Sequence, residues 1–327
     1  MKILIRLPNW LGDIVMSTAF ISAVKQQYPT ATIDIVIKKE LAGIAAFIVG
    51  INHIHLFSKQ EYKGLGGAYR FGKALKDHHY DLYFNLPQSL SSLAMAWASG
   101  TKKRIGYAKE GGIFLLTNAI KQPKGVHRVD EYLYLLEKSA GAIAPKPEVS
   151  LNGNFSASAN NAIVNFNSEA SSRRMPVEKG KSLINSLTSM FKTTQFVFVG
   201  SFKEAGFIES LLSGLENQER LHNYAGKTDL KGLAELISQS KVVLTTDSGP
   251  AHLANALNVP VVVLFGAGNE LNTAPYNPKG LNIIRAAKLD CEPCVRNVCK
   301  LYGVPKCMQL LDENKIINAL SLHLDNA

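Results

Sequence analysis

Short apolar runs alternate with segments of helical spacing along most of the chain. Between Asp13 and Gln27, apolar residues recur at i, i+3 and i+4, which predicts a helix. Helical spacing also predicts a helix whose final residues are 73–79, and another helix that spans 89–99. The strands predicted in the first half are Lys2–Leu7, Thr32–Ile37, Ile54–Phe57, Asp81–Leu86 and, as a short strand or turn, Lys103–Tyr107.

The same alternation begins again after residue 161. A polar loop over 167–176 leads into a predicted helix, Val177–Met190. The strands predicted in this half are Ala162–Phe166, Gln195–Val199, Val242–Thr246, Pro260–Phe265 and Leu281–Arg285. Strands that alternate with helices favour parallel, doubly wound sheets.

The segment 141–161, rich in Ala, Pro, Ser and Asn, is the predicted linker. We therefore expect an α/β protein with two Rossmann-like domains, 1–150 and 151–327, facing a central cleft. The carboxyl ends of the strands would direct loops into that cleft. The last helix is a candidate to pack back on the first domain.

Composition and charge narrow the class of protein. With 46% hydrophobic and 19% charged residues, the 327-residue chain is typical of a globular protein. The longest apolar run, Leu41–Ile51, is too short to span a bilayer, and the N-terminus does not look like a signal peptide. We therefore expect a cytoplasmic protein.

The positive charge is concentrated in the first half. Residues 1–150 carry 19 Lys and Arg against 11 Asp and Glu, whereas residues 151–327 carry 17 against 15. A basic half indicates an anionic partner. Among the possible anionic partners (nucleic acid, a phospholipid surface or a phosphorylated acceptor), nucleic acid ranks last, because no Arg-rich helix or interleaved aromatic pattern accompanies the charge.

The segment Lys241–His252 reads as a buried strand, a polar loop and a helix start. Pro250 suits the first helical position, and Asp247, Ser248 and Gly249 suit a loop or cap. A helix N-terminus offers backbone N–H groups and a positive dipole end to an anion such as phosphate. The alternative is an ordinary capped helix.

Six segments, in order, resemble those of glycosyltransferase family 9, the heptosyltransferases of lipopolysaccharide core synthesis. The resemblance runs from residue 1 to about 310 and looks closest to the ADP-heptose:LPS heptosyltransferase II group. The matching segments are Asn9–Val15, Lys103–Tyr107, His127–Tyr132, Tyr224–Leu230, Thr246–His252 and Phe265–Asn269.

The resemblance implies a GT-B fold and an inverting transfer of heptose from ADP-heptose to a lipopolysaccharide inner-core acceptor. That acceptor is lipid-linked and anionic, so the resemblance also implies a peripheral position on the inner face of the inner membrane. It implies no metal and no cofactor. The C-terminal domain would hold the nucleotide and the N-terminal domain the acceptor, which agrees with the basic first half.

Asp13 is the candidate catalytic base, because direct displacement needs a carboxylate near the attacking hydroxyl. The alternative is that Asp13 caps the following helix. Candidate acceptor contacts are Gly12, Ser89, Arg104 and Arg128. Ser89 and the two arginines are also open to a surface or capping role.

Arg173 or Arg174 is expected to meet the donor pyrophosphate. The family has a Lys-Arg-Trp-Pro-like segment where this chain reads Arg173-Arg174-Met175-Pro176. Arg in place of Lys keeps the charge and adds a bidentate donor. The other candidate donor contacts are Lys227, Thr228, Thr246, Asp247, Ser248, Gly249 and His252.

Three further hypotheses stay open. One is a GT-B transferase or epimerase for another nucleotide sugar, and another is a nucleotide-binding module without activity. A dinucleotide oxidoreductase is weaker, because no Gly-x-Gly-x-x-Gly follows the first strand. Cys291, Cys294, Cys299 and Cys307 are closely spaced, but free or packed thiols rank above a zinc site.

Overall fold

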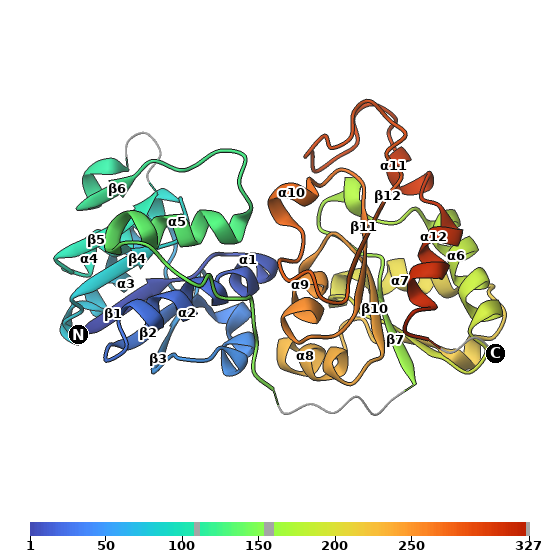
Figure 1. Ribbon diagram of the computed structural model, residues 1–327, viewed down its shortest axis with the longest axis horizontal. Helices are drawn as coiled ribbons and strands as arrows, with labels where there is room; N and C mark the ends of the chain where they lie inside the picture. Colours follow the sequence, from blue (N-terminus) through green and yellow to red (C-terminus); the bar gives the residue numbers. More distant parts are fainter. Residues whose placement is uncertain (108–111, 154–159, 325–327) are drawn as a thin grey trace. The chain divides into compact units, whose positions relative to one another are not determined.

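The computed structural model describes residues 1–107, 112–153 and 160–324. The chain divides into two compact units, Met1–Asn152 and Gly153–Ala327 (Figure 1). Within the described residues, each unit contains a six-stranded sheet in which every pairing is parallel.

The first unit is built on strands in the order β3-β2-β1-β4-β5-β6. The strands are β1 (Lys2–Arg6), β2 (Thr32–Lys38), β3 (His53–Phe57), β4 (Leu82–Asn85), β5 (Lys103–Tyr107) and β6 (Asn118–Ile120). The helices are α1 (Leu11–Met16), α2 (Thr18–Gln27), α3 (Gly64–Ala74), α4 (Leu90–Ala98) and α5 (Arg128–Ala140), with 3₁₀ turns at Lys39–Phe47, Lys76–His78 and Ile113–Leu115.

The second unit has the order β12-β11-β10-β7-β8-β9. Its strands are β7 (Asn161–Asn165), β8 (Gln195–Phe198), β9 (Leu221–Asn223), β10 (Val242–Thr246), β11 (Val261–Phe265) and β12 (Leu281–Arg285). Its helices are α6 (Val177–Met190), α7 (Ala205–Leu212), α8 (Leu230–Ser238), α9 (Gly249–Ala256), α10 (Glu270–Thr273), α11 (Lys306–Gln309) and α12 (Glu313–Leu320), with 3₁₀ turns at Ser171–Arg173, Phe202–Glu204 and Gln218–Arg220.

Numbered within its own unit, each sheet follows the doubly wound order 3-2-1-4-5-6. The strand order therefore reverses between β1 and β4 in the first unit and between β7 and β10 in the second. Open α/β sheets bind ligands beyond the carboxyl ends of the strands at this switch point. In both units the chain leaving the first strand passes through a loop and enters a helix beside that point.

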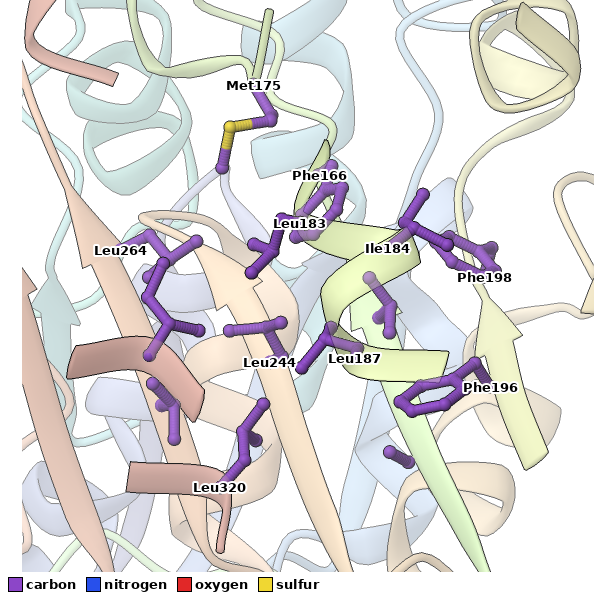
Figure 2. Close-up of a cluster of buried hydrophobic side chains, with 14 of the residues drawn as sticks. Phe166, Met175, Leu183, Ile184, Leu187, Phe196, Phe198, Leu244, Leu264 and Leu320 are labelled. Carbon is purple, nitrogen blue, oxygen red and sulfur yellow. The ribbon is translucent and has the colours of Figure 1, made fainter. Parts of the chain in front are cut away.

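The core of the second unit fixes the strands that carry the candidate donor residues. Figure 2 shows Leu183, Ile184 and Leu187 of α6 directed toward the sheet, where Leu244 and Leu264 lie on β10 and β11. Burial of each such side chain stabilises the fold by about 1.5–3 kcal/mol.

Helix α12 is also part of the second unit's core. Its apolar face contributes Ile316 and Leu320, which are fully buried, and the helix packs against α6, β11 and β12. Ser182 and Lys179 of α6 both bind Glu313 at the start of α12. The last helix, which was a candidate to pack on the first half, thus buries its apolar face in the second.

The central strands lie where the sequence predicts them. The edge strands β6 and β9, of three residues each, were not predicted. The helix expected over 13–27 begins at Leu11 and is interrupted at Ser17, whose hydroxyl donates to the Ile14 carbonyl. Among the described helices, none combines the length and apolar content needed to cross a bilayer.

Candidate active site

Asp13 lies in the first turn of α1, directly beyond the carboxyl end of β1. The residue at the helix cap is Trp10, and it caps without a side-chain hydrogen bond. Because the helix begins at Leu11, two residues before the predicted start, Asp13 is its third residue and Gly12 is helical. The alternative that Asp13 is the cap of this helix is therefore wrong.

Arg128 is brought next to Asp13 by the packing of α5 on α1. Its Nε lies 3.6 Å from Asp13 Oδ1, and its Nη1 lies 2.8 Å from Glu131 Oε2. Helix α5 starts at Arg128 because the His127 ring Nδ1 accepts a hydrogen bond from the Val129 N–H. One guanidinium thus faces two carboxylates in the first unit.

The environment of Asp13 favours proton uptake. Burial raises the pKa of the Asp13 carboxyl above its usual value, Arg128 lowers it, and the nearby Glu131 raises it. The net direction is upward. The Asp13 side chain is still 24% exposed, so its carboxylate is accessible to a substrate hydroxyl. A raised pKa and partial access are the properties of a general base.

Two candidate acceptor residues have structural partners instead. Ser89 caps α4, with its hydroxyl accepting from the Ser92 N–H. Arg104 lies near the amino end of β5, and its guanidinium donates to the carbonyls of Thr101 (2.6 Å) and Leu115 (3.0 Å). Ligands bind beyond the opposite, carboxyl ends of such strands, so the structure does not bring Arg104 to the Asp13 end of the sheet.

In the second unit, Asp247 and Arg173 meet across the switch point. Asp247 follows β10 and is 5% exposed, and its Oδ2 lies 3.1 Å from Arg173 Nη1 on the loop after β7. Arg174 points elsewhere: it donates to the Ser168 carbonyl at 3.0 Å and lies over the Phe207 ring at 5.2 Å. The two adjacent arginines therefore differ: Arg173 pairs with Asp247, whereas Arg174 is bound to Ser168 and Phe207.

Met175 anchors this arginine loop. It is 1% exposed, belongs to the core cluster with Phe166, and its N–H donates to the Phe166 carbonyl at 3.0 Å. A buried apolar side chain is what the position requires, which accounts physically for Met where the family has Trp.

The loop after β10 is held by a network of polar side chains. Ser248 Oγ accepts from Asn165 Nδ2 at 2.8 Å and donates to the Thr246 carbonyl at 2.9 Å. Thr246 Oγ1 donates to the Asn167 carbonyl at 2.6 Å. Since the Ser248 side chain does not cap α9, the first turn of that helix is not closed by its own cap residue. The hydroxyls of Thr246 and Ser248, which we expected to contact phosphate, thus form hydrogen bonds within the protein that hold the loop.

Gly268 and Arg285 are not among the site residues predicted from the sequence, although Gly268 lies in the matching segment Phe265–Asn269, and both shape the surroundings of Asp247. A Cβ at Gly268 would overlap Asp247 Oδ2. Arg285 binds Glu270 through two nitrogens and Glu292 at 3.2 Å, which ties down the loop after β11. Burial raises the pKa of Asp247, while Arg173 and Arg285 lower it; the net direction is upward.

The remaining donor candidates differ in position. His252 is buried in the first turn of α9, which Gly249 begins, beside the Asp247 loop. Lys227 and Thr228 follow β9, the edge strand, three strand positions from β10. At about 4.8 Å per strand that is about 14 Å. Lys227 lies over the Tyr224 ring at 5.7 Å.

The four cysteines are free thiols, with Cys307 buried and the others half-buried. Burial raises the pKa of Cys307 to about 11. Across the part of the chain that the structure describes, no group of three or more His, Cys, Asp or Glu side chains is arranged to hold a metal ion.

Each unit therefore presents charged side chains beyond the carboxyl ends of its central strands. The model of glycosyltransferase family 9 (heptosyltransferase) matches residues 68–304. The chain belongs to this family. Its α/β, GT-B fold class is thereby confirmed, as is the assignment to glycosyltransferases.

Individual family members agree with this assignment. The chain is 27% identical over 307 residues to lipopolysaccharide heptosyltransferase 2 of Salmonella typhimurium, covering 85% of this chain and 86% of that one. The structure of Escherichia coli ADP-heptose lps heptosyltransferase II matches with a TM-score of 0.83 at 23% identity, over 98% of both chains. Escherichia coli heptosyltransferase WaaC with ADP-2-deoxy-2-fluoro heptose matches with a TM-score of 0.75 at 16% identity, over 98% of this chain and 99% of that one.

Proposed function

We propose that this family 9 enzyme transfers heptose from ADP-heptose to a lipopolysaccharide inner-core acceptor, with inversion at the sugar carbon and without a metal. The observation that carries the mechanism is Asp13: it does not cap α1, it is partly exposed, and burial raises its pKa. The names of the relatives and the ADP-heptose analogue bound to one of them support the choice of donor and acceptor.

In this mechanism Asp13 takes the proton from the acceptor hydroxyl as the hydroxyl oxygen forms a bond to the anomeric carbon. The bond from that carbon to the β-phosphate oxygen breaks on the opposite face, which inverts the configuration. ADP leaves with the electron pair. The reaction therefore needs a base for the proton of the acceptor hydroxyl, and cationic groups for the negative charge that develops on the leaving diphosphate.

Arg173 is the proposed partner of the leaving diphosphate. Its side chain is 26% exposed and already lies beside the loop that begins α9. Arg side chains bind phosphate oxygens bidentately, and a helix N-terminus adds backbone N–H groups. Asp247 would hold Arg173 in place before the donor binds. Gly249 and His252 belong to the same proposed site, and Ser248 and Thr246 keep its loop in shape.

The proposed acceptor side includes Arg128, whose side chain is 33% exposed. Its charge suits a phosphorylated sugar acceptor, and Gly12 provides a residue without a side chain next to Asp13. Ser89 and Arg104 are weaker candidates because of the structural bonds that they make.

A peripheral position on an anionic membrane surface is part of the proposal. Tyr69 of α3 and Trp97 of α4 are 40% and 50% exposed and lie 5.8 Å apart by ring centroids. Arg70 and Lys73 are exposed on the same helix α3. Exposed aromatic rings beside basic side chains favour the interface of an anionic bilayer. Sedimentation with anionic but not with neutral vesicles is expected, and equal sedimentation with both would contradict it.

A donor panel tests the proposed reaction. We expect ADP-heptose to bind more tightly than UDP- or GDP-sugars in calorimetry, and heptose to be transferred to a truncated lipopolysaccharide core. Preference for a UDP-sugar, or its epimerisation without transfer, would favour the other nucleotide-sugar enzymes and contradict this proposal.

A further inference from the structure

Glu131 is a buried carboxylate, and both of its oxygens accept hydrogen bonds from Arg128. Its side chain is 7% exposed, and Oε1 and Oε2 lie 3.0 and 2.8 Å from Arg128 Nη1. Gln88 Nε2 donates to Oε1 at 3.4 Å, and the Tyr107 hydroxyl donates to the Glu131 backbone carbonyl at 2.6 Å. The residue is thus fixed through both its main chain and its carboxylate.

The other side of the same guanidinium faces Asp13. Arg128 Nε lies 3.6 Å from Asp13 Oδ1, and this buried nitrogen makes no hydrogen bond within the described residues. Glu131 accepts hydrogen bonds from Nη1 of Arg128, whereas Asp13 forms only a longer ion pair with Nε. Because the guanidinium is a rigid plane, the bonds of Glu131 fix the direction in which Nε points.

This arrangement decides how strongly Arg128 acts on Asp13. A direct two-bond pair between Arg and a carboxylate would hold the carboxylate deprotonated and occupy its oxygens. We propose, building on the role of Asp13 as base in the proposed function, that Glu131 is a positioning residue that holds Arg128 away from a direct pair with Asp13. Asp13 therefore keeps both its proton affinity and a free oxygen for the acceptor hydroxyl.

Glu131→Gln tests this role, because glutamine keeps the size and removes the charge. Removing a like charge and releasing Arg128 both lower the pKa of Asp13, by about one unit or more for a direct Arg partner. The acid limb of kcat/KM should therefore move to lower pH, and kcat should fall about tenfold or more as the base weakens. Affinity for ADP-heptose should stay within about twofold, since α5 and the donor loops belong to different units.

The matched control is Glu137→Gln on the same helix, which should leave the pH profile in place. The pKa of Asp13 can also be followed without activity, by ¹³C NMR of protein labelled at the Asp carboxyl carbons, with Asp13→Asn to assign the signal. If Glu131→Gln does not fold, Glu131→Asp, which keeps the charge but is one methylene shorter, should give a smaller shift in the same direction.

An Asp13 signal that titrates unchanged in Glu131→Gln would overturn the inference, even with an active wild type. Absence of transfer from ADP-heptose by the wild-type enzyme would instead contradict the proposed function. The NMR titration would still decide the role of Glu131 in that case.

Discussion

Arg173 and Asp247 form an ion pair of 3.1 Å, although 73 positions separate them in the chain. One follows β7 and the other β10, the two neighbouring strands at which the strand order of the second sheet reverses. The topology, and not local sequence, therefore brings them together. In the proposed enzyme this pair keeps a guanidinium ready for the donor diphosphate.

Replacing Arg173 should weaken ADP binding. We expect Arg173→Ala to raise the Kd for ADP about 10- to 100-fold, since a charged hydrogen bond contributes about 1.5–3 kcal/mol. Arg174→Ala is the matched comparison: it loses the Phe207 contact and the bond to Ser168, so it should lower the Tm but leave Kd nearly unchanged. Calorimetry and thermal unfolding separate the two. Equal losses of affinity in both variants would contradict the division of roles.

Gly268 should not tolerate a side chain. A methyl group in Gly268→Ala would overlap Asp247 Oδ2 and displace the carboxylate or its loop, at a cost of about 1–3 kcal/mol in stability. ADP affinity should fall as well, because Asp247 positions Arg173. The control is Gly206→Ala on α7, where a Cβ meets nothing within 4 Å. Chemical denaturation and calorimetry check both effects, and a Gly268→Ala enzyme with wild-type stability and affinity would show that the loop is not constrained.

A histidine cluster at the edge of the first sheet should make stability depend on pH. The ring of His55 lies 4.6 Å from that of His53 and 4.7 Å from that of His78, and its Nε2 lies 2.7 Å from the Tyr80 hydroxyl. Burial, followed by the two other histidines, lowers the pKa of His55 to about 4, although Asp34 raises it.

Because the folded pKa lies below the ordinary value of 6.5, the unfolded chain binds the proton more tightly. The free energy of unfolding should therefore fall as pH decreases from about 6.5 to about 4. His55→Gln should flatten that dependence when denaturation is measured between pH 7 and 4.5. A slope that is the same in His55→Gln and wild type would assign the acid sensitivity to other groups.

The sequence predicts most of the fold because its central strands are continuous apolar runs. β10 and β12 have the predicted bounds, as does α6. The edge strands β6 and β9 were missed, since three residues are too few to show a period, and β6 is mostly exposed. The start of α1 was placed too late because Leu11-Gly12 resembles a turn in sequence.

The candidate site is harder to predict because its contacts are not local. Adjacent arginines such as Arg173 and Arg174 can be told apart only when the loop backbone is known. Arg128 and Glu131 have the i, i+3 spacing of an ordinary surface pair, and the sequence does not show that the Glu131 side chain is buried. Gly268 belongs to the matching segment Phe265–Asn269, but it approaches Asp247 from the loop after the neighbouring strand, so the sequence does not show that it must lack a side chain.

The transfer rate of Asp13→Asn tests the central claim most directly. Asparagine keeps the size of the side chain but accepts no proton, so kcat for transfer from saturating ADP-heptose should fall about 10²- to 10⁴-fold. The Kd for ADP-heptose should be unchanged, because the proposed donor residues lie in the other unit. A variant that transfers heptose at the wild-type rate would contradict the assignment of Asp13 as the base.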